Sequence, residues 1–136
     1  PEGDLFLCGC FGSSLFALRA RSGEEVWRGH SEGPLFATPR ADIVRRQVYC
    51  ADLRGCLLCL EQQGDEITPS WRYHTTPRAP PYAGSEPIFS SPLVCNSSGN
   101  VCFGCTDCKL HCLSPRGQAR CAACGGVGVC VMFRPG

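Results

Sequence analysis

The chain has 136 residues, of which 43% are hydrophobic and 18% charged, with 13 Lys and Arg against 12 Asp and Glu. The near-zero net charge provides no electrostatic basis for binding a nucleic acid or an anionic membrane. No uninterrupted apolar window of about 18 residues is present, so we expect no transmembrane helix. Thirteen cysteines, close to a tenth of the chain, require that a disulfide or metal framework be considered first.

The N-terminal segment Pro1-Glu2-Gly3-Asp4 has neither an initiator Met nor a basic-then-apolar leader, so we expect a cytoplasmic piece of a longer chain with reduced thiols. The 16 Gly and 11 Pro are spread between short apolar runs rich in Val, Phe, Tyr, Leu and Cys. This pattern predicts many short strands joined by turns and argues against a helical bundle.

A repeat runs through the chain. Residues 6–18, 48–60 and 101–113 align without gaps, and each copy reads as an apolar strand, a tight turn with Asp, Gly or Ser, and a second apolar strand. Each copy therefore predicts a β-hairpin. A Gly turn and a Trp strand follow, ending at Trp27 in the first copy and Trp71 in the second, and Cys121 stands at the Trp position of the third.

A third block, Pro34–Pro39 and Pro87–Pro92, predicts one further strand and brings the total to four strands per repeat. The hairpins start at residues 6, 48 and 101, a spacing of 42 and then 53 residues, and the excess is a polar, Pro-rich insertion at residues 75–84. Four strands in a repeat of this length are typical of a propeller blade. The sequence predicts an all-β fold, a partial β-propeller of about three four-stranded blades.

The segment Ala17-Leu18-Arg19-Ala20-Arg21-Ser22-Gly23-Glu24-Glu25-Val26-Trp27 resembles the repeat of quinoprotein-type β-propellers, the fold of pyrroloquinoline-quinone (PQQ) alcohol dehydrogenases and their non-enzymatic relatives. The resemblance covers residues 5 to about 118. It implies that Trp27 and Trp71 stack between neighbouring blades, and that the glycine after the turn Asp lets the hairpin reverse tightly. We assign residues 1–121 to the propeller repeats and residues 122–136 to an atypical tail.

Two further segments, Pro87–Pro92 and residues 104–114, resemble one branch of this family. That branch is the C-terminal propeller of the animal β-alanine-activating enzymes, acyl-adenylating members of the acyl-CoA synthetase superfamily that also carry a phosphopantetheine carrier domain. The resemblance implies that adenylation and carrier attachment belong to other parts of the polypeptide.

Two CxxC pairs, Cys105/Cys108 and Cys121/Cys124, have nearly the spacing of a zinc ribbon. The repeat favours another interpretation, because Cys105 aligns with Cys10 and Asp52, and cysteines occupy positions that call for small apolar residues. We therefore predict no metal site. Disulfides are also disfavoured, because thirteen is odd and residues three apart on one strand point to opposite faces. Asn96-Ser97-Ser98 reads as a hairpin turn rather than a glycan acceptor.

No nucleophile lies beside a base in a recognisable motif. We expect His30 and His74 in loops after the Trp strands and His111 on a strand, all with packing or surface roles. Asp52 and Asp107 fall in turns, where an Asp side chain caps the backbone. The calcium-held quinone of the alcohol dehydrogenases is accompanied by adjacent cysteines, and no two cysteines are adjacent here. We predict no catalytic, cofactor-binding or metal-binding residues.

The resulting hypothesis is a non-catalytic propeller segment that serves as an accessory or interaction domain of a larger acid-activating ligase. Its expected partners are other domains of the same polypeptide, a carrier domain or another protein, through inter-blade loops and above all residues 75–84. The alternatives are a fragment of a PQQ-dependent dehydrogenase and a propeller scaffold for protein assembly, as in the bacterial outer-membrane barrel-assembly lipoprotein.

Overall fold

The computed structural model describes residues 3–124, with side chains through residue 120, and contains strands and no helix within that range. Consequently, no helix in the described part is long and apolar enough to cross a membrane. The strands are β1 (Leu5–Gly9), β2 (Ser14–Arg19), β3 (Glu25–His30), β4 (Arg40–Asp42), β5 (Gln47–Ala51), β6 (Cys56–Gln63), β7 (Glu66–His74), β8 (Leu93–Val94), β9 (Val101–Gly104), β10 (Lys109–Leu113) and β11 (Ala119–Cys124).

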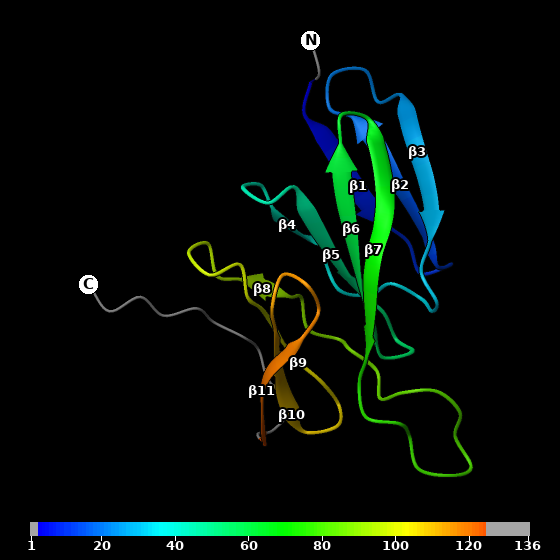
Figure 1. Cartoon of the computed structure of the whole chain (residues 1–136). Coiled ribbons are helices and arrows are strands. Elements are labelled where there is room, and N and C mark those ends of the chain that lie inside the picture. Colours follow the sequence, from blue (N-terminus) through cyan, green and yellow to red (C-terminus); the bar gives the residue numbers. More distant parts are fainter. Residues whose placement is uncertain (1–2, 125–136) are drawn as a thin grey trace.

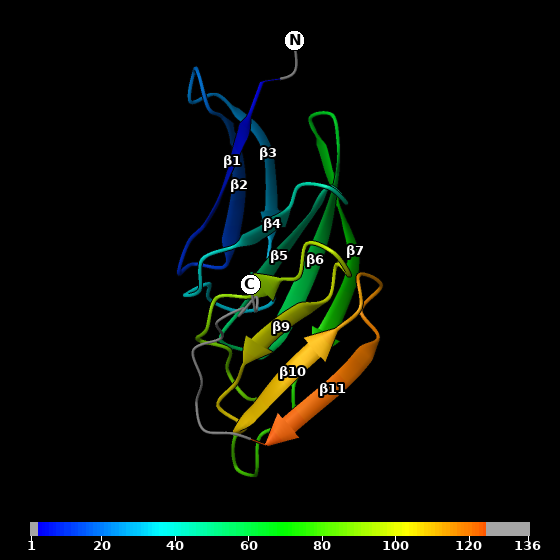
Figure 2. The ribbon, with the colours of Figure 1, turned by 90° about the vertical axis from the view of Figure 1, so that its left-hand side faces the viewer.

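These strands form three antiparallel sheets that follow one another along the chain. The sheets have the orders β1-β2-β3, β4-β5-β6-β7 and β8-β9-β10-β11, and successive sheets lie side by side (Figures 1 and 2). One buried apolar cluster joins the first sheet to the second, and another joins the second to the third. The predicted all-β architecture, a partial propeller of about three blades, is confirmed.

The predicted gap-free alignment of the hairpins is confirmed by their register. In each turn the first residue donates its N–H to the carbonyl of the fifth, at 3.0 Å, 3.0 Å and 3.1 Å from Cys10, Asp52 and Cys105. The fourth residue has positive φ in every copy, at Ser13, Gly55 and Cys108. Of these three residues, only Gly55 adopts the left-handed conformation without steric cost, because glycine has no Cβ.

The third block differs from the prediction. Pro34–Pro39 and Pro87–Pro92 are not strands, and the short strands β4 and β8 follow them. The prolines lack an N–H, and Leu35 and Ile88 donate theirs to carbonyls of the preceding hairpin turn. Because β4 pairs with β5 and β8 with β9, the fourth strand of each repeat joins the next sheet. The first sheet therefore has three strands in the described part.

Both tryptophans lie at the junctions between sheets, as the resemblance implies. Trp27 packs against the cluster between the first two sheets, and Trp71 against the cluster between the last two. The Trp71 Nε1–H donates to the Pro115 carbonyl oxygen at 2.9 Å, and its ring lies over Gly117. Residue 121 pairs with Cys112, just as Trp71 pairs with Cys59, so the third copy has Cys121 at the Trp position.

The last strand of the third sheet is β11. Strand β11 continues to Cys124, so the backbone of residues 122–124 belongs to the third sheet. The rest of the expected tail, residues 125–136, lies outside the described residues. Residues 96–98 form the predicted turn, between β8 and β9.

Candidate functional site

Polar side chains gather where each hairpin turn meets the loop that arrives from the preceding sheet. In the second sheet, Asp52 is buried, and its Oδ1 accepts N–H groups from Arg54 and Cys56 at 2.9 Å and 3.0 Å. Its Oδ2 accepts the Gly33 N–H at 3.1 Å. One carboxylate therefore caps its own turn and ties it to the preceding loop.

The same junction of the third sheet holds a larger network around His111, which is buried on β10. Its Nε2 lies 2.8 Å from Asp107 Oδ2, and its Nδ1 lies 2.9 Å from the Tyr73 hydroxyl of β7. The imidazole stacks on Phe103, with centroids 5.1 Å apart and planes 5° from parallel. Asp107 also accepts the Thr76 hydroxyl at 2.8 Å. The network thus connects β7, the following loop and the third sheet.

The electrostatics of this network favour an ionised Asp107. Burial raises the pKa of its carboxyl, but hydrogen bonds from Thr76 and His111 outweigh that effect and hold the pKa below its usual value. Burial and the nearby Asp107 charge raise the pKa of Tyr73, so the phenol stays protonated. Because the Asp107 carboxylate can only accept, His111 Nε2 donates its hydrogen to it. In the neutral imidazole, His111 Nδ1 then accepts the hydrogen bond from the Tyr73 hydroxyl. The chemistry is that of a satisfied structural network.

Two groups of metal-ligating side chains occur in the described part of the chain. Donor atoms of Cys105, Asp107 and His111 lie within 4.8 Å of one another, and so do those of Glu32, Cys56 and His74. In both groups the histidine Nε2 is already hydrogen-bonded to the carboxylate. An ion would have to replace these hydrogen bonds, and burial further raises the pKa of both thiols, which disfavours the thiolate that metals bind.

His30 and His74 are the last residues of β3 and β7 rather than loop residues, because the hairpin pairing extends that far. His111 is on a strand, as predicted. Because Asp52 and Asp107 already accept backbone and side-chain donors, their carboxylates do not fit a calcium-held quinone.

The cysteines divide according to their place in the sheets. Cys50, Cys56, Cys59 and Cys105 are buried, as predicted for small core residues, whereas Cys8 and Cys108 are exposed. Burial raises the pKa of Cys50 and of Cys59 to about 12. Of the four cysteines with zinc-ribbon spacing, the side chains of Cys121 and Cys124 lie outside the described residues.

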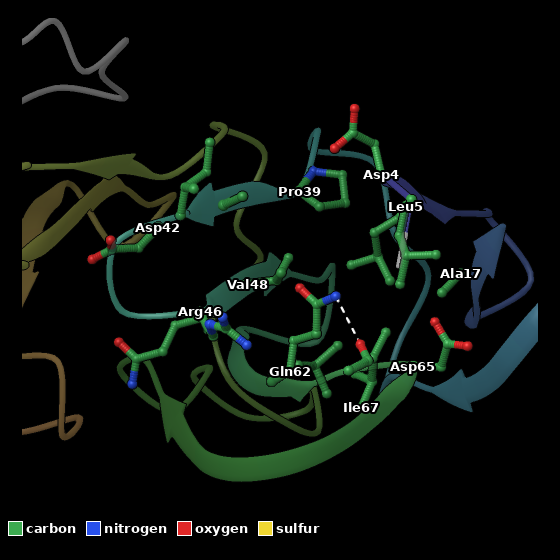
Figure 3. A pocket seen from close by; sticks show the side chains of 17 residues that line it. Asp4, Leu5, Ala17, Pro39, Asp42, Arg46, Val48, Gln62, Asp65 and Ile67 are labelled. Carbon is green, nitrogen blue, oxygen red and sulfur yellow. Dashed lines mark hydrogen bonds between the residues drawn. The ribbon is translucent and has the colours of Figure 1, made fainter. Parts of the chain in front are cut away.

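A pocket of about 700 Å³ lies between the first and second sheets (Figure 3). Leu5, Val48 and Ile67 supply part of its apolar wall, and Arg46, Gln62 and Asp65 supply polar groups. The Gln62 amide already donates to the Gly64 carbonyl oxygen at 2.9 Å. Strand β1 borders the pocket as the edge of the first sheet, whereas the equivalent strands β5 and β9 pair there with β4 and β8.

The insertion at residues 75–84 extends away from the sheets (Figure 1). Its first residue, Thr75, is buried and donates its hydroxyl to the Glu86 carbonyl oxygen at 2.6 Å. The exposed part begins beyond Thr76 and carries Tyr82, over which the Arg78 guanidinium lies 4.4 Å from the ring centroid. The surface that a partner could reach is therefore shorter than the predicted ten residues.

Comparisons with known proteins support the fold. No protein-family model and no curated protein sequence matches the chain. Among solved structures, BamB from Moraxella catarrhalis is similar, with a TM-score of 0.69 and 21% identity over 88% of this chain. That protein has a β-propeller of the PQQ-like type. The chain spans only 34% of the BamB chain, so the likeness shows a propeller fold and not a function.

Proposed function

We propose that this chain is an arc of a larger β-propeller and works as a non-catalytic interaction domain. The observation that carries the proposal is a difference in exposure between equivalent positions. Cys50 is buried between the first two sheets, whereas its counterpart Cys8 is exposed. Phe6 on the same outer face of the first sheet is 60% exposed. Both ends of the arc present surfaces that the inner sheet buries, so we infer that further blades cover them.

The experiment that tests this proposal is the self-association of the chain expressed by itself. Without neighbouring blades the open faces should drive association, so the wild-type chain should be poorly soluble or partly unfolded. A lysine at Phe6 or Leu110 should raise the soluble monomer fraction in sedimentation. The control is Ile43→Lys, because Ile43 is 87% exposed in the β4–β5 turn, away from both open faces. A monomeric wild-type chain with a sharp cooperative melt would contradict the proposal.

The finer part of the proposal concerns the rest of the polypeptide. The resemblance of Pro87–Pro92 and residues 104–114 to the propellers of β-alanine-activating enzymes supports a cytoplasmic acyl-adenylating parent of the acyl-CoA synthetase family. In that setting the loop around Tyr82 would contact a carrier domain or a protein partner. Amino-acid-dependent ATP–pyrophosphate exchange by the longest natural chain that contains this segment tests the parent activity, and its absence would remove this part of the proposal.

The contact role of the loop has its own test. Replacing Arg78 and Tyr82 by serine should lower recovery of the partner while leaving the fold intact, because Tyr82 is 63% exposed and the half-buried Arg78 lies over its ring. Thr75 and Thr76 must be retained, since their hydroxyls bond Glu86 and Asp107. Unchanged partner recovery and activity would eliminate this role.

A propeller scaffold for protein assembly is the second candidate, and the similarity to BamB favours it. Both candidates share an interaction role and differ in what the propeller is joined to. A parent chain with no adenylation activity but with a stable multiprotein complex in size-exclusion chromatography would favour the scaffold.

A further inference from the structure

Two cysteines face each other across the third sheet. Cys102 on β9 and Cys112 on β10 are directly opposite in the antiparallel register, and their Sγ atoms lie 2.7 Å apart. Both side chains are half-buried. The two strands run side by side with β11 beyond β10 (Figure 2). CxxC spacing does not indicate this pair, because only strand pairing brings residues ten apart into contact.

The register also gives the pair a favourable geometry. The hydrogen bond from Cys105 N–H to the Lys109 carbonyl fixes the alternation of the ladder, so Phe103 and His111 form a hydrogen-bonded pair and Cys102 and Cys112 a non-hydrogen-bonded pair. Cα atoms of such pairs lie about 4.5 Å apart, which is within the range of roughly 4.4–6.8 Å that disulfides span. A bond between the sulfurs therefore requires no movement of the strands.

The pair lies on the open face of the third sheet. Cys102 and Cys112 are equivalent to Tyr49 and Cys59, which in the second sheet face the cluster shared with the third. Nothing in residues 3–124 covers the corresponding face of β9 and β10 to that degree, and Leu110 on it is 41% exposed. Both sulfurs are half-buried in this chain, so a small oxidant can reach them wherever no further blade covers this face.

We propose that Cys102 and Cys112 are a redox-responsive dithiol that closes to a cross-strand disulfide on exposure to a peroxide. One thiolate attacks the O–O bond, forming a sulfenic acid and releasing water after proton uptake. The other thiol attacks the sulfenic sulfur and releases a second water. Two thiols and one hydrogen peroxide give one disulfide and two waters, with two electrons passing from sulfur to peroxide. The oxidised pair staples β9 to β10.

The test is peptide mapping of the whole chain, kept monomeric by Phe6→Lys, after treatment with an excess of hydrogen peroxide and alkylation of the remaining thiols. Trypsin cleaves after Lys109, between the two cysteines, and yields peptide 110–116 with Cys112 as its single cysteine. We expect most of this peptide to be linked to peptide 79–109, with a mass two daltons below the sum of the two reduced peptides. Dithiothreitol should release it.

Matched variants assign the link, since peptide 79–109 holds four cysteines. Cys102→Ser should lower the linked species at least ten-fold, whereas Cys95→Ser and Cys108→Ser should leave it unchanged. The proposal is overturned if peptide 110–116 stays unlinked in the wild type, or if the link persists in Cys102→Ser. It is equally overturned if the partner is peptide 121–136, which holds Cys121, Cys124 and Cys130 and begins with the residue that pairs with Cys112 on β11.

Discussion

Leu57 and Leu110 occupy the same position in consecutive hairpins, yet Leu57 is completely buried and Leu110 is 41% exposed. Each is opposite the last residue before its turn, Ala51 and Gly104 respectively. The difference arises from what lies above each sheet, because the third sheet covers Leu57. Equivalent residues of the repeat thus point to the same face of their sheets, whereas their burial depends on whether another sheet covers that face.

This pair gives a direct stability prediction. Leu57→Ala should lower the free energy of unfolding by about 2–5 kcal/mol, because it leaves a cavity between two sheets. Leu110→Ala should cost less than about 1 kcal/mol, since much of that side chain remains in water. Urea unfolding followed by tryptophan fluorescence measures both in the Phe6→Lys background, because the wild-type chain is expected to associate. Equal losses for the two variants would mean that the open face is covered in solution.

The contact between Gly117 and Trp71 predicts a second effect. Gly117 has φ of 79°, and a Cβ there would approach the Trp71 ring to 2.7 Å. Gly84 has φ of 84° but open space around it, so Gly84→Ala reports only the left-handed strain, roughly 1–2 kcal/mol. Gly117→Ala should cost clearly more in the free energy of unfolding. If the two substitutions are equally destabilising, Trp71 does not pack on this turn in solution.

Acid stability should depend on Asp107. Its pKa is lowered in the folded state, because hydrogen bonds from Thr76 and His111 outweigh the effect of burial. The carboxylate therefore contributes stability that is fully present above the unfolded pKa, near 4, and is lost as pH falls through the folded pKa. Asp107→Asn should be less stable at pH 7, by about 1–3 kcal/mol, because a buried network loses a charged acceptor.

The measurement is the free energy of unfolding between pH 7 and pH 3. We expect the Asp107→Asn curve to be shallower than the wild-type curve below about pH 4. Glu66→Gln on the exposed end of β7 serves as the control and should keep the wild-type slope. A slope unchanged by Asp107→Asn would show that the carboxylate is not specifically stabilised by its partners.

Cys95 should be the thiol that reacts first with an alkylating agent near neutral pH. Hydrogen bonds from Ser97 and Ser98 lower the pKa of Cys95 to about 6, and its sulfur lies 3.3 Å from Ser97 Oγ. Thiolates are the reactive form. Ser97→Ala should therefore slow iodoacetamide labelling of Cys95 several-fold at pH 6.5, with little change at pH 10. Equal labelling rates of the wild type and Ser97→Ala at pH 6.5 would contradict this assignment.

Much of the architecture could be predicted from the sequence, because the repeat is defined by residues that are close together along the chain. The three hairpins, their turns and the two Trp strands follow from alternating apolar residues and turn residues, which act over a few positions along the chain. Pro34–Pro39 resembles a strand in composition but does not form one, because its backbone groups bond to two hairpin turns: Leu35 N–H to the Cys10 carbonyl of its own repeat and the Pro34 carbonyl to the Leu53 N–H of the next. Proximity between repeats decides that outcome.

The candidate site was less accessible to sequence reasoning. Asp52 and Asp107 could be assigned to turns, but the partners they bond, Gly33 and Thr76, belong to loops from the preceding sheet. The sequence shows that each aspartate belongs to a turn. The group that its second carboxylate oxygen accepts a hydrogen bond from depends on how the sheets are stacked. Likewise, Cys102 and Cys112 became a pair through strand register.

The sequence by itself determined the all-β repeat, the strand order within each hairpin and the identity of the turns, since these depend on side-chain alternation and local backbone preferences. The tertiary structure alone decided which repeat positions are buried, which cysteines meet, and how His111 is held between Tyr73 and Asp107. Those properties arise from packing one sheet on the next. Hydrophobic burial and cross-sheet hydrogen bonds act between residues that the chain itself holds far apart.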